Sequence, residues 1–386
     1  MKICIISNGF TGTTIPLAEH LQRGKHDVDV FYLLFKGTTT LDSLDLNEPI
    51  KFSFTPQRLT SLNPIFNYLS KDVRIYTKYI IKERNRLSNT PFGIIQRILN
   101  KIIIRQFCHK YIKDNYDIVN VIVYPRFMTE VCDYLNKIQM PFFITFHEVL
   151  NSLIGNRTII PFVEKACLYN CNIVVHSEAT KKDLLLTSNV TNLASRIHVI
   201  HFGAFEGYLA YGEGEKCIDE DDYLLYFGNI LPYKGLSFLY NAIALLKKAP
   251  KIKVVVAGRG KDPILNRMST DNRFVVINNY VGNKELAYLI SHSRVIVCPY
   301  LAASQSGVVQ TAMAFKKPVI ATRVGAFEEV INDNNGILVS PGNSEELVKA
   351  ITKCYSSREQ HPYDIPKKYT WPFIVAQYDK LFRKCY

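Results

Sequence analysis

The sequence predicts an α/β protein made of two doubly wound domains that face a central cleft, each with a parallel sheet covered by helices. Three observations support this fold class. The 386 residues exceed the size at which one hydrophobic core usually stops growing. Short, continuously apolar segments, typical of strands buried on both faces, alternate with helical segments along the chain. The composition shifts to Gly, Glu and Asp around 206–222, which marks a domain boundary.

The predicted first domain spans 1–206. A small-residue loop that contains Gly9 and Gly12 follows its first strand and leads into a helix over 15–23. Ser177 is the predicted N-cap of a helix over 178–184. The expected strands are 1–7, 27–34, 118–123, 142–146, 173–175 and 198–200.

The predicted second domain spans 207–364. Its expected strands are 223–228, 253–257, 274–277, 295–299, 318–321 and 336–339, and its expected helices are 235–248, 284–291, 307–315 and 344–354. Residues 365–386, amphipathic from 369 on, are expected to pack back onto the first domain, with the second as the alternative. Domains of this kind bind ligands at the carboxyl ends of their strands.

Composition narrows the functional classes. Hydrophobic residues make up 47% and charged residues 21%, which is ordinary for a globular protein. The net charge of +13 favours anionic partners, either phosphorylated small molecules, a lipid surface or nucleic acid. Because we find no recognised nucleic-acid motif, we expect no nucleic-acid partner. The nine cysteines lack metal-type spacing and are expected to be reduced thiols.

The N-terminal residues MKICIISNGF predict a buried strand and not a signal peptide. No run of about 18 apolar residues occurs, so we expect no membrane span and a cytoplasmic location.

Two strand-to-helix loops of the second domain are candidate anion sites. Lys234 stands at the start of a helix, where free N–H groups and the helix dipole also attract anions. Ser306, Gly307 and Val308 enter another helix and expose several N–H groups. Each feature has a plain alternative: a solvated lysine in a turn for the first, and an ordinary serine N-cap for the second.

Two further turns follow strands of this domain. The run Ala257-Gly258-Arg259-Gly260 lacks the third glycine of a dinucleotide fingerprint, so we interpret it as a place where the backbone approaches a ligand closely. Glu329 lies in the turn after strand 318–321 and faces the expected cleft. Its alternative role is that of a helix N-terminal glutamate favoured by the dipole.

Five segments of the second half occur in the order and spacing of one enzyme family: YFGNILPYKGLSFLYNAI, VVVAGRG, NNYVGNKELAYLI, VIVCPYLAASQSGVVQTAMAFKKPVIATRVGAFEEVI and NGILVSPGNSEELVKAI. They resemble the donor-binding domain of GT-B glycosyltransferases of the large family 4 group. The first half matches more loosely through YPRF, FFITFHEV, NIVVHSEATKKDLL and HVIHFGAF.

The resemblance implies the GT-B architecture of two Rossmann-like domains. It also implies a retaining, metal-independent transfer from a nucleotide diphosphate sugar, UDP- or GDP-linked, to a glycan or lipid-linked acceptor of a cell-surface polysaccharide. The nucleotide sugar is a substrate, and no cofactor or metal is expected. The departing phosphate would accept the proton of the acceptor, so no protein base is required. Glu148, next to His147, is a candidate acceptor-side residue and no more. The acidic run 219–222 is interpreted as solvated.

The same resemblance assigns roles to single residues. Lys234 would bind the donor diphosphate, and the backbone of Ser306, Gly307 and Val308 would hold the distal phosphate. The main chain of Tyr280 and Val281 would meet the nucleobase. His147 would face the transferred sugar, or else be a buried, hydrogen-bonded histidine. The loop with Gly9 and Gly12 would border the acceptor and the donor phosphates.

Two departures from the family pattern keep alternatives open. Asn229 stands where the family usually has arginine, and Arg259 is a candidate electrostatic substitute. The paired glutamates of the family would fall at Ala302 or Ala303 and at Thr311 or Ala312. The alternatives are therefore a catalytically weak nucleotide-sugar-binding accessory protein and a sugar-nucleotide epimerase.

Residues 71–114 hold eleven Lys or Arg against three Asp or Glu, a net charge of +8. Apolar residues recur among them at helical spacing. This pattern predicts a basic amphipathic helix of the kind that lies on anionic membrane surfaces. The alternative is a solvated helix face over an apolar core.

Overall fold

The computed structural model describes residues 1–35, 38, 40–41, 44–45, 53, 55–59, 64–69, 73–81, 90–123, 127–147, 160–188, 190, 192–246, 252–303, 306–356 and 365–384. The chain divides into two compact units. The first consists of Met1–Gly203 and Trp371–Tyr386, and the second of Ala204–Thr370.

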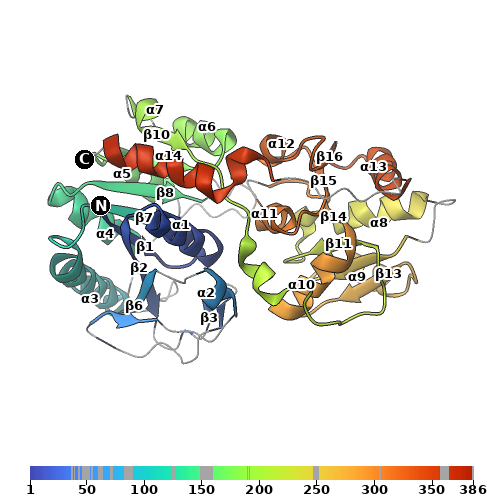
Figure 1. Cartoon of the computed structure of the whole chain (residues 1–386), viewed down its shortest axis with the longest axis horizontal. Helices are drawn as coiled ribbons and strands as arrows, with labels where there is room; N and C mark the ends of the chain where they lie inside the picture. The colour runs from blue at the N-terminus through green and yellow to red at the C-terminus, as the bar shows by residue number, and fades with distance from the viewer. Residues whose placement is uncertain are drawn as a thin grey trace. The chain divides into compact units, whose positions relative to one another are not determined.

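The first unit is built on an eight-stranded sheet in the order β10-β9-β8-β7-β1-β2-β6-β5 (Figure 1). All neighbouring strands in it are parallel except β5 and β6. The central strands are apolar runs with almost no exposure, as expected where helices cover both faces. The strands are β1 (Lys2–Ser7), β2 (Asp27–Phe35), β5 (Gln57–Arg58), β6 (Arg74–Ile80), β7 (Ile118–Val123), β8 (Phe142–Phe146), β9 (Asn172–Val175) and β10 (Ile197–Val199), with β3 (Thr40–Leu41) and β4 (Leu44–Asp45) as a separate antiparallel pair.

Two helices of the first unit, α1 and α6, overlap the predicted helices over 15–23 and 178–184. Helix α1 begins four residues earlier than expected, and Ser177 caps α6 by accepting the Thr180 N–H at 3.0 Å. The C-terminal helix α14 packs beside α1, where the rings of His20 and Trp371 stack with their centroids 5.8 Å apart. The helices are α1 (Thr11–Arg23), α2 (Pro64–Leu69), α3 (Pro91–Phe107) with the π-turn η2 (Cys108–Ile112), α4 (Met128–Lys137), α5 (Ile160–Leu168), α6 (Glu178–Thr187), α7 (Leu193–Arg196) and α14 (Trp371–Lys384).

The second unit has a fully parallel six-stranded sheet in the order β13-β12-β11-β14-β15-β16. All six predicted strands are present within two residues of the expected bounds: β11 (Tyr223–Phe227), β12 (Val254–Ala257), β13 (Phe274–Ile277), β14 (Ser293–Cys298), β15 (Val319–Thr322) and β16 (Gly336–Val339). Its helical segments are η3 (Glu206–Tyr211), η4 (Pro232–Lys234), α8 (Leu236–Leu245), α9 (Ile264–Ser269), α10 (Asn283–His292), α11 (Gly307–Ala314), α12 (Phe327–Val330), α13 (Ser344–Ser356) and η5 (Lys367–Tyr369).

The division between the units differs from the predicted boundaries. It falls after Gly203, three residues before the expected position, and the second unit extends to Thr370 instead of 364. Hydrogen bonds explain both shifts. The Ala204 N–H donates to the Tyr369 carbonyl at 3.3 Å, and the Phe205 N–H donates to the Gln310 carbonyl at 3.1 Å. Both crossing segments are therefore tied to the second unit.

The expected helix over 71–114 is only partly correct. Residues 74–80 form strand β6, which pairs with β2 over seven residues and buries Ile75 and Ile80. The sequence RIYTKYI is rich in β-branched and aromatic residues, and this favours a pleated, half-buried strand over a helix. The helical part is α3, while 71–72 and 82–89 lie outside the described residues.

Within the described part of the chain, no helix has both the length and the hydrophobicity needed to cross a bilayer.

Candidate functional site

Each sheet reverses its strand order at one point. In the second unit the chain runs outward from β11 through β12 to β13, and then returns to place β14 on the other side of β11. In the first unit the same change of direction separates β1 from β7. Parallel α/β sheets bind ligands at the carboxyl ends of the strands beside such a switch point. The loops after β1, β11 and β14 are therefore the expected ligand-binding loops.

Lys234 lies at the switch point of the second unit. The loop after β11 reaches the end of β14 at Gly235, which has a φ of 74°. A Cβ on Gly235 would lie 1.8 Å from the carbonyl oxygen of Pro299, so only glycine permits this approach. The Lys234 Nζ lies 3.7 Å from the ring centroid of Tyr300, directly after β14. A fixed cation is thus held between β11 and β14.

The N-terminus of α11 lies at the same switch point. Ser306 is its N-cap, and the Ser306 side chain makes no capping hydrogen bond to the helix. The Ser306 Oγ instead lies 3.4 Å from the Tyr300 hydroxyl. Val308 adjoins the loop after β11, because a Cβ on Gly228 would lie 3.6 Å from its Cγ2. Tyr300 therefore links the Lys234 ammonium to a helix N-terminus, and the two together favour an anion.

The loops after β12 and β13 continue this edge of the sheet. The Ile230 N–H donates to the Arg259 carbonyl at 3.0 Å, and the Gly260 N–H donates to the Asn278 side chain at 3.2 Å. Tyr280 is 68% exposed, and it follows β13 together with Val281. Since β13 lies two strands from β11, this loop is roughly 10 Å from the Lys234 loop. That spacing leaves room for a ribose and a base beside the anion site.

Asn229 and Arg259 both have exposed side chains. The carbonyl of Asn229 accepts the Tyr226 hydroxyl at 2.9 Å, so its backbone is fixed in the loop. No described contact joins Arg259 to Lys234. Whether Arg259 compensates electrostatically for Asn229 stays a prediction.

Glu329 lies in α12 after β15, which is the neighbour of β14 on the side away from β11. The Thr322 hydroxyl at the end of β15 donates to the Tyr300 carbonyl at 2.5 Å, which joins this loop to the switch point. The Glu329 carbonyl accepts the Lys368 ammonium at 2.8 Å and the Tyr369 hydroxyl at 2.6 Å. Its backbone is thereby anchored to the end of the second unit.

A residue next to one position of the absent glutamate pair is an unexpected candidate. Thr311 is buried and its hydroxyl donates to the Gly307 carbonyl at 2.8 Å, so it is engaged within α11. The preceding residue, Gln310, is only 4% exposed, and its Oε1 has no hydrogen-bond partner among the described residues. A buried oxygen without a donor is expected to receive one from a ligand or a water molecule. The sequence reasoning missed Gln310.

In the first unit, aromatic rings gather at the carboxyl ends of β1, β8 and β9. His147 follows β8 and stacks on Phe10 with centroids 3.8 Å apart and planes 9° apart. His176 follows β9, lies 4.9 Å from His147 between ring centroids, and stacks on Phe202 at 3.8 Å. Phe10 has a φ of 60° and is the last residue of the short loop that follows β1, residues 8–10. Gly12 lies in the first turn of α1, not in the loop where it was expected.

Hydrogen bonding defines the tautomer of His176. Its Nδ1 lies 2.7 Å from the Ile200 carbonyl oxygen, which can only accept, so Nδ1 bears the proton and Nε2 has a lone pair. That Nε2, the Nε2 of His147 and the Oδ1 of Asn8 are all buried without a hydrogen-bond partner in the described structure. Three polar atoms at one sheet edge are thus available for hydrogen bonds with a ligand or water.

Both histidines are neutral at neutral pH. Burial lowers the pKa of His176 to about 4. Burial, with a smaller contribution from the neighbouring His176, lowers the pKa of His147 well below its ordinary value. Neutral imidazoles of this kind orient hydroxyl groups by hydrogen bonding and are poor proton acceptors at pH 7.

His176, Phe202 and Tyr300 were also missed by the sequence reasoning. His176 and Tyr300 stand within two residues of a strand end, and the rule that ligands bind at carboxyl ends identifies such positions. Phe202 had no such signal, since only the tertiary fold brings it onto His176. Glu148 lies outside the described residues, as do residues 304–305 of the predicted phosphate loop.

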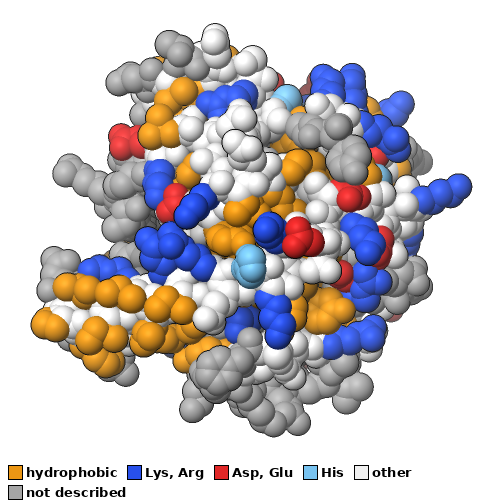
Figure 2. Space-filling model, turned by 90° about the vertical axis from the view of Figure 1, so that its left-hand side faces the viewer, with side chains coloured by type: hydrophobic (Ala, Val, Ile, Leu, Met, Phe, Trp, Pro, Cys, Tyr) orange, Lys and Arg blue, Asp and Glu red, His pale blue; other side chains and the backbone are white. Residues whose placement is uncertain are grey.

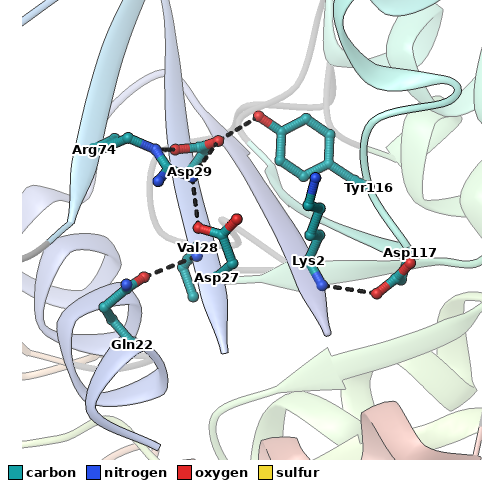
Figure 3. Close-up of polar contacts among 8 residues, drawn as sticks. All are labelled: Lys2, Gln22, Asp27, Val28, Asp29, Arg74, Tyr116 and Asp117. Carbon is teal, nitrogen blue, oxygen red and sulfur yellow. Dashed lines mark hydrogen bonds and ion pairs between the residues drawn. The ribbon is translucent and has the colours of Figure 1, made fainter. Parts of the chain in front are cut away.

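A second polar cluster lies at the amino ends of β1, β2 and β6 (Figure 3). It borders a cavity of about 320 Å³. Arg74 donates to Asp29 and to Asp27 at 2.6 Å each, and the Tyr116 hydroxyl donates to Asp29 at 2.6 Å. The hydrogen bond from Arg74 to Asp29 raises the pKa of Arg74, and burial raises that of Tyr116. Because these groups are paired with one another at the edge opposite to His147, we interpret the cluster as a structural link between strands.

The described residues contain no group of three or more His, Cys, Asp or Glu side chains placed to hold a metal ion.

Comparison with known proteins identifies similar sequences and similar folds. Residues 221–357 match the sequence family described as glycosyl transferases group 1. An uncharacterized glycosyltransferase of Methanocaldococcus jannaschii is 27% identical over 268 residues, which cover 64% of this chain and 70% of that protein. The GDP-mannose:glycolipid 4-beta-D-mannosyltransferase of Xanthomonas campestris is 28% identical over 103 residues, or 25% of this chain and 29% of the enzyme. The structure of Anabaena HepE in complex with UDP-glucose has a TM-score of 0.63 at 15% identity and covers the whole of both chains.

The chain is a glycosyltransferase with the GT-B fold. Lys234, Tyr300 and the α11 N-terminus lie in the part of the second unit that matches the group 1 glycosyl transferases.

Proposed function

We propose that this protein transfers a sugar from a nucleotide diphosphate sugar to a glycan or lipid-linked acceptor during synthesis of a cell-surface polysaccharide. The observation that supports this most directly is the convergence of Lys234 and the α11 N-terminus on Tyr300 at the switch point of the second unit. A cation next to a helix N-terminus suits a diphosphate.

The comparisons are consistent with this donor class. HepE binds UDP and UDP-glucose in its crystal structures, and the Xanthomonas enzyme uses GDP-mannose. We therefore propose a UDP- or GDP-linked donor. The loop with Tyr280 and Val281 would meet the base, since it lies two strands from the phosphate site. Glu329 and the unpaired oxygen of Gln310 would accept hydrogen bonds from hydroxyls of the sugar or the ribose.

The proposed mechanism is a retaining transfer without a metal ion. As the bond to the leaving diphosphate breaks, negative charge grows on its oxygens, and the Lys234 ammonium and the N–H groups at Gly307 and Val308 stabilise it without reorganising. The departing phosphate then accepts the proton of the attacking hydroxyl. His147 and His176 would orient the sugar and acceptor hydroxyls, in agreement with their neutral state. The loop from Gly9 to Gly12 would border the acceptor.

We propose a cytoplasmic enzyme that works at the membrane surface. The support is the acceptor of the Xanthomonas relative, a glycolipid, and the exposed surface of α3 described below. The nucleotide sugar is consumed as substrate, and the proposal includes no cofactor.

A donor-turnover assay separates the proposal from its alternatives. The protein is incubated with UDP- and GDP-linked sugars, with and without a lipid extract as acceptor source, and products are resolved by chromatography. Sugar transfer to the extract supports the transferase. A new nucleotide sugar formed without acceptor would identify an epimerase instead. Binding of nucleotide without any product from a full set of donors and extracts would favour an accessory protein.

A further inference from the structure

Helix α3 (Pro91–Phe107) has two apolar faces. The inner face packs into the core of the first unit through Ile104 and Phe107, each about 1% exposed. Asn100 fixes this orientation, because its side chain accepts the Ile81 N–H and donates to the Ile81 carbonyl, both at 2.8 Å. The helix cannot therefore rotate to bury its other face in the same core.

The outer face of α3 is hydrophobic and exposed to solvent. Fourteen large hydrophobic residues of the described chain are exposed, and six of them lie within eleven residues of this helix. They are Phe92 (56%), Ile94 (44%), Ile95 (53%), Ile98 (52%), Leu99 (43%) and Ile102 (46%). Their spacing of three and four residues aligns them in one stripe. Figure 2 shows an elongated band of hydrophobic side chains on this side of the molecule, bordered by Lys and Arg.

Positive charge runs along one edge of this stripe. Arg97, Lys101 and Arg105 follow at intervals of four residues, and α3 has no acidic residue. Glu130 lies 3.5 Å from Lys101 and 3.9 Å from Arg105 and offsets one of these charges. Residues 90–114 hold five Lys or Arg against the single Asp114, a net charge of +4. An apolar stripe beside a basic row is complementary to a lipid bilayer, in which anionic headgroups lie next to the hydrocarbon of the acyl chains.

We propose that the outer face of α3 docks this protein onto an anionic lipid bilayer, with the helix lying in the plane of the headgroups. The charges favour a bilayer over a second copy of the chain. A symmetric contact between two α3 helices would bring two basic rows close together, and like charges oppose such a contact. The 17-residue helix is about 26 Å long and apolar on one free side only, so it lies on the bilayer instead of crossing it.

This inference rests on the proposed function at the membrane surface and assigns that contact to one helix face, and its measurement needs no donor or acceptor. Flotation with vesicles of phosphatidylcholine, alone or with phosphatidylglycerol, tests it on the full chain. We expect binding to the anionic vesicles, weaker binding to the neutral ones, and a loss with added salt. Each basic residue near the surface accounts for about a fivefold change in binding at low salt.

The test variant is Ile98→Glu combined with Ile102→Glu. Since both side chains are about half exposed, the variant is expected to keep the melting temperature of the wild type. We expect more than about a tenfold loss of vesicle binding, because two apolar groups no longer leave water. The matched control is Leu168→Glu with Leu186→Glu, which adds the same charge at positions 73% and 75% exposed on α5 and α6. This control is expected to bind within about threefold of the wild type, because both leucines lie on other helices, outside the apolar stripe of α3.

Three results would overturn the proposal: equal losses in both double variants, unchanged binding of the α3 variant, or no binding of the wild type to anionic vesicles. A wild-type dimer that becomes monomeric in the α3 variant, without vesicle binding, would assign the surface to a second copy. Nucleotide binding measured on the same samples distinguishes these failures from failure of the proposed function.

Discussion

The buried histidine pair makes stability of the first unit depend on pH. His176 has a folded-state pKa of about 4, against an ordinary value of 6.5, so between these values the unfolded chain binds a proton that the folded chain does not. The free energy of unfolding therefore falls as the pH is lowered through this range. From pH 8 to pH 5 the loss from His176 alone is about 2 kcal/mol, and it approaches about 3 kcal/mol near pH 4.

His176→Phe removes this titration. The variant loses the hydrogen bond to the Ile200 carbonyl, so its stability at pH 8 is expected to be lower than that of the wild type. The quantity that distinguishes the two proteins is the slope of the free energy of unfolding against pH. Between pH 8 and pH 5 the variant should lose about 2 kcal/mol less than the wild type. His147 titrates in the same direction and remains in both proteins.

Urea unfolding at several pH values, followed by tryptophan fluorescence, measures this slope. The chain has a single tryptophan, Trp371, which is 3% exposed and belongs to the first unit, so the signal reports that unit. His109→Phe, at an exposed histidine of the same unit, is the matched substitution at a site away from the buried pair. If the free energy of unfolding changes with pH by the same amount in the wild type and in His176→Phe, the assignment of a buried, neutral imidazole is refuted.

Three further predictions concern the second unit. Lys234→Ala should weaken binding of a nucleoside diphosphate by about tenfold to a hundredfold, since it removes a charge-assisted contact; unchanged affinity by calorimetry would exclude the diphosphate role. Gly235→Ala should lower thermal stability well beyond Gly342→Ala, because both have a φ near 75° but only the first would place a Cβ 1.8 Å from a carbonyl oxygen. Gly342→Ala should lower the free energy of unfolding by about 1–2 kcal/mol, and an equal loss in both variants would contradict the close packing of Gly235 against β14. Gln310→Leu should lower nucleotide-sugar affinity about fivefold to tenfold without loss of thermal stability; unaltered affinity would show that its unpaired oxygen serves no ligand.

The sheet of the second unit was predictable because its strands are buried on both faces. Each appears in the sequence as a short apolar run, and segments such as Phe274–Ile277 and Gly336–Val339 were placed with their observed bounds. The sequence pattern gave the wrong prediction for 74–80, where a helix was expected and strand β6 is observed. There a Lys- and Arg-rich sequence masked the two-residue alternation of β6, and only pairing with β2 makes this alternation decisive.

The candidate site was predictable where a loop has a local signature. Lys234 and Gly307 stand at strand-to-helix turns, and the structure places Lys234 and Ser306, the residue before Gly307, beside Tyr300. Stacking of Phe202 on His176 depends on contacts between segments distant in sequence, so no local sequence pattern predicts it. The unpaired atoms of Gln310 and His176 became visible only once burial and hydrogen bonds were known.

The central claim, that the switch point of the second unit binds a nucleoside diphosphate without a metal ion, is tested most directly by thermal stability with UDP, GDP, ADP and CDP in the presence of a chelator. A ligand that binds only the folded state raises the melting temperature. We expect a shift with UDP or GDP that persists in the chelator and disappears in Lys234→Ala. No shift with any of the four nucleotides would contradict the account.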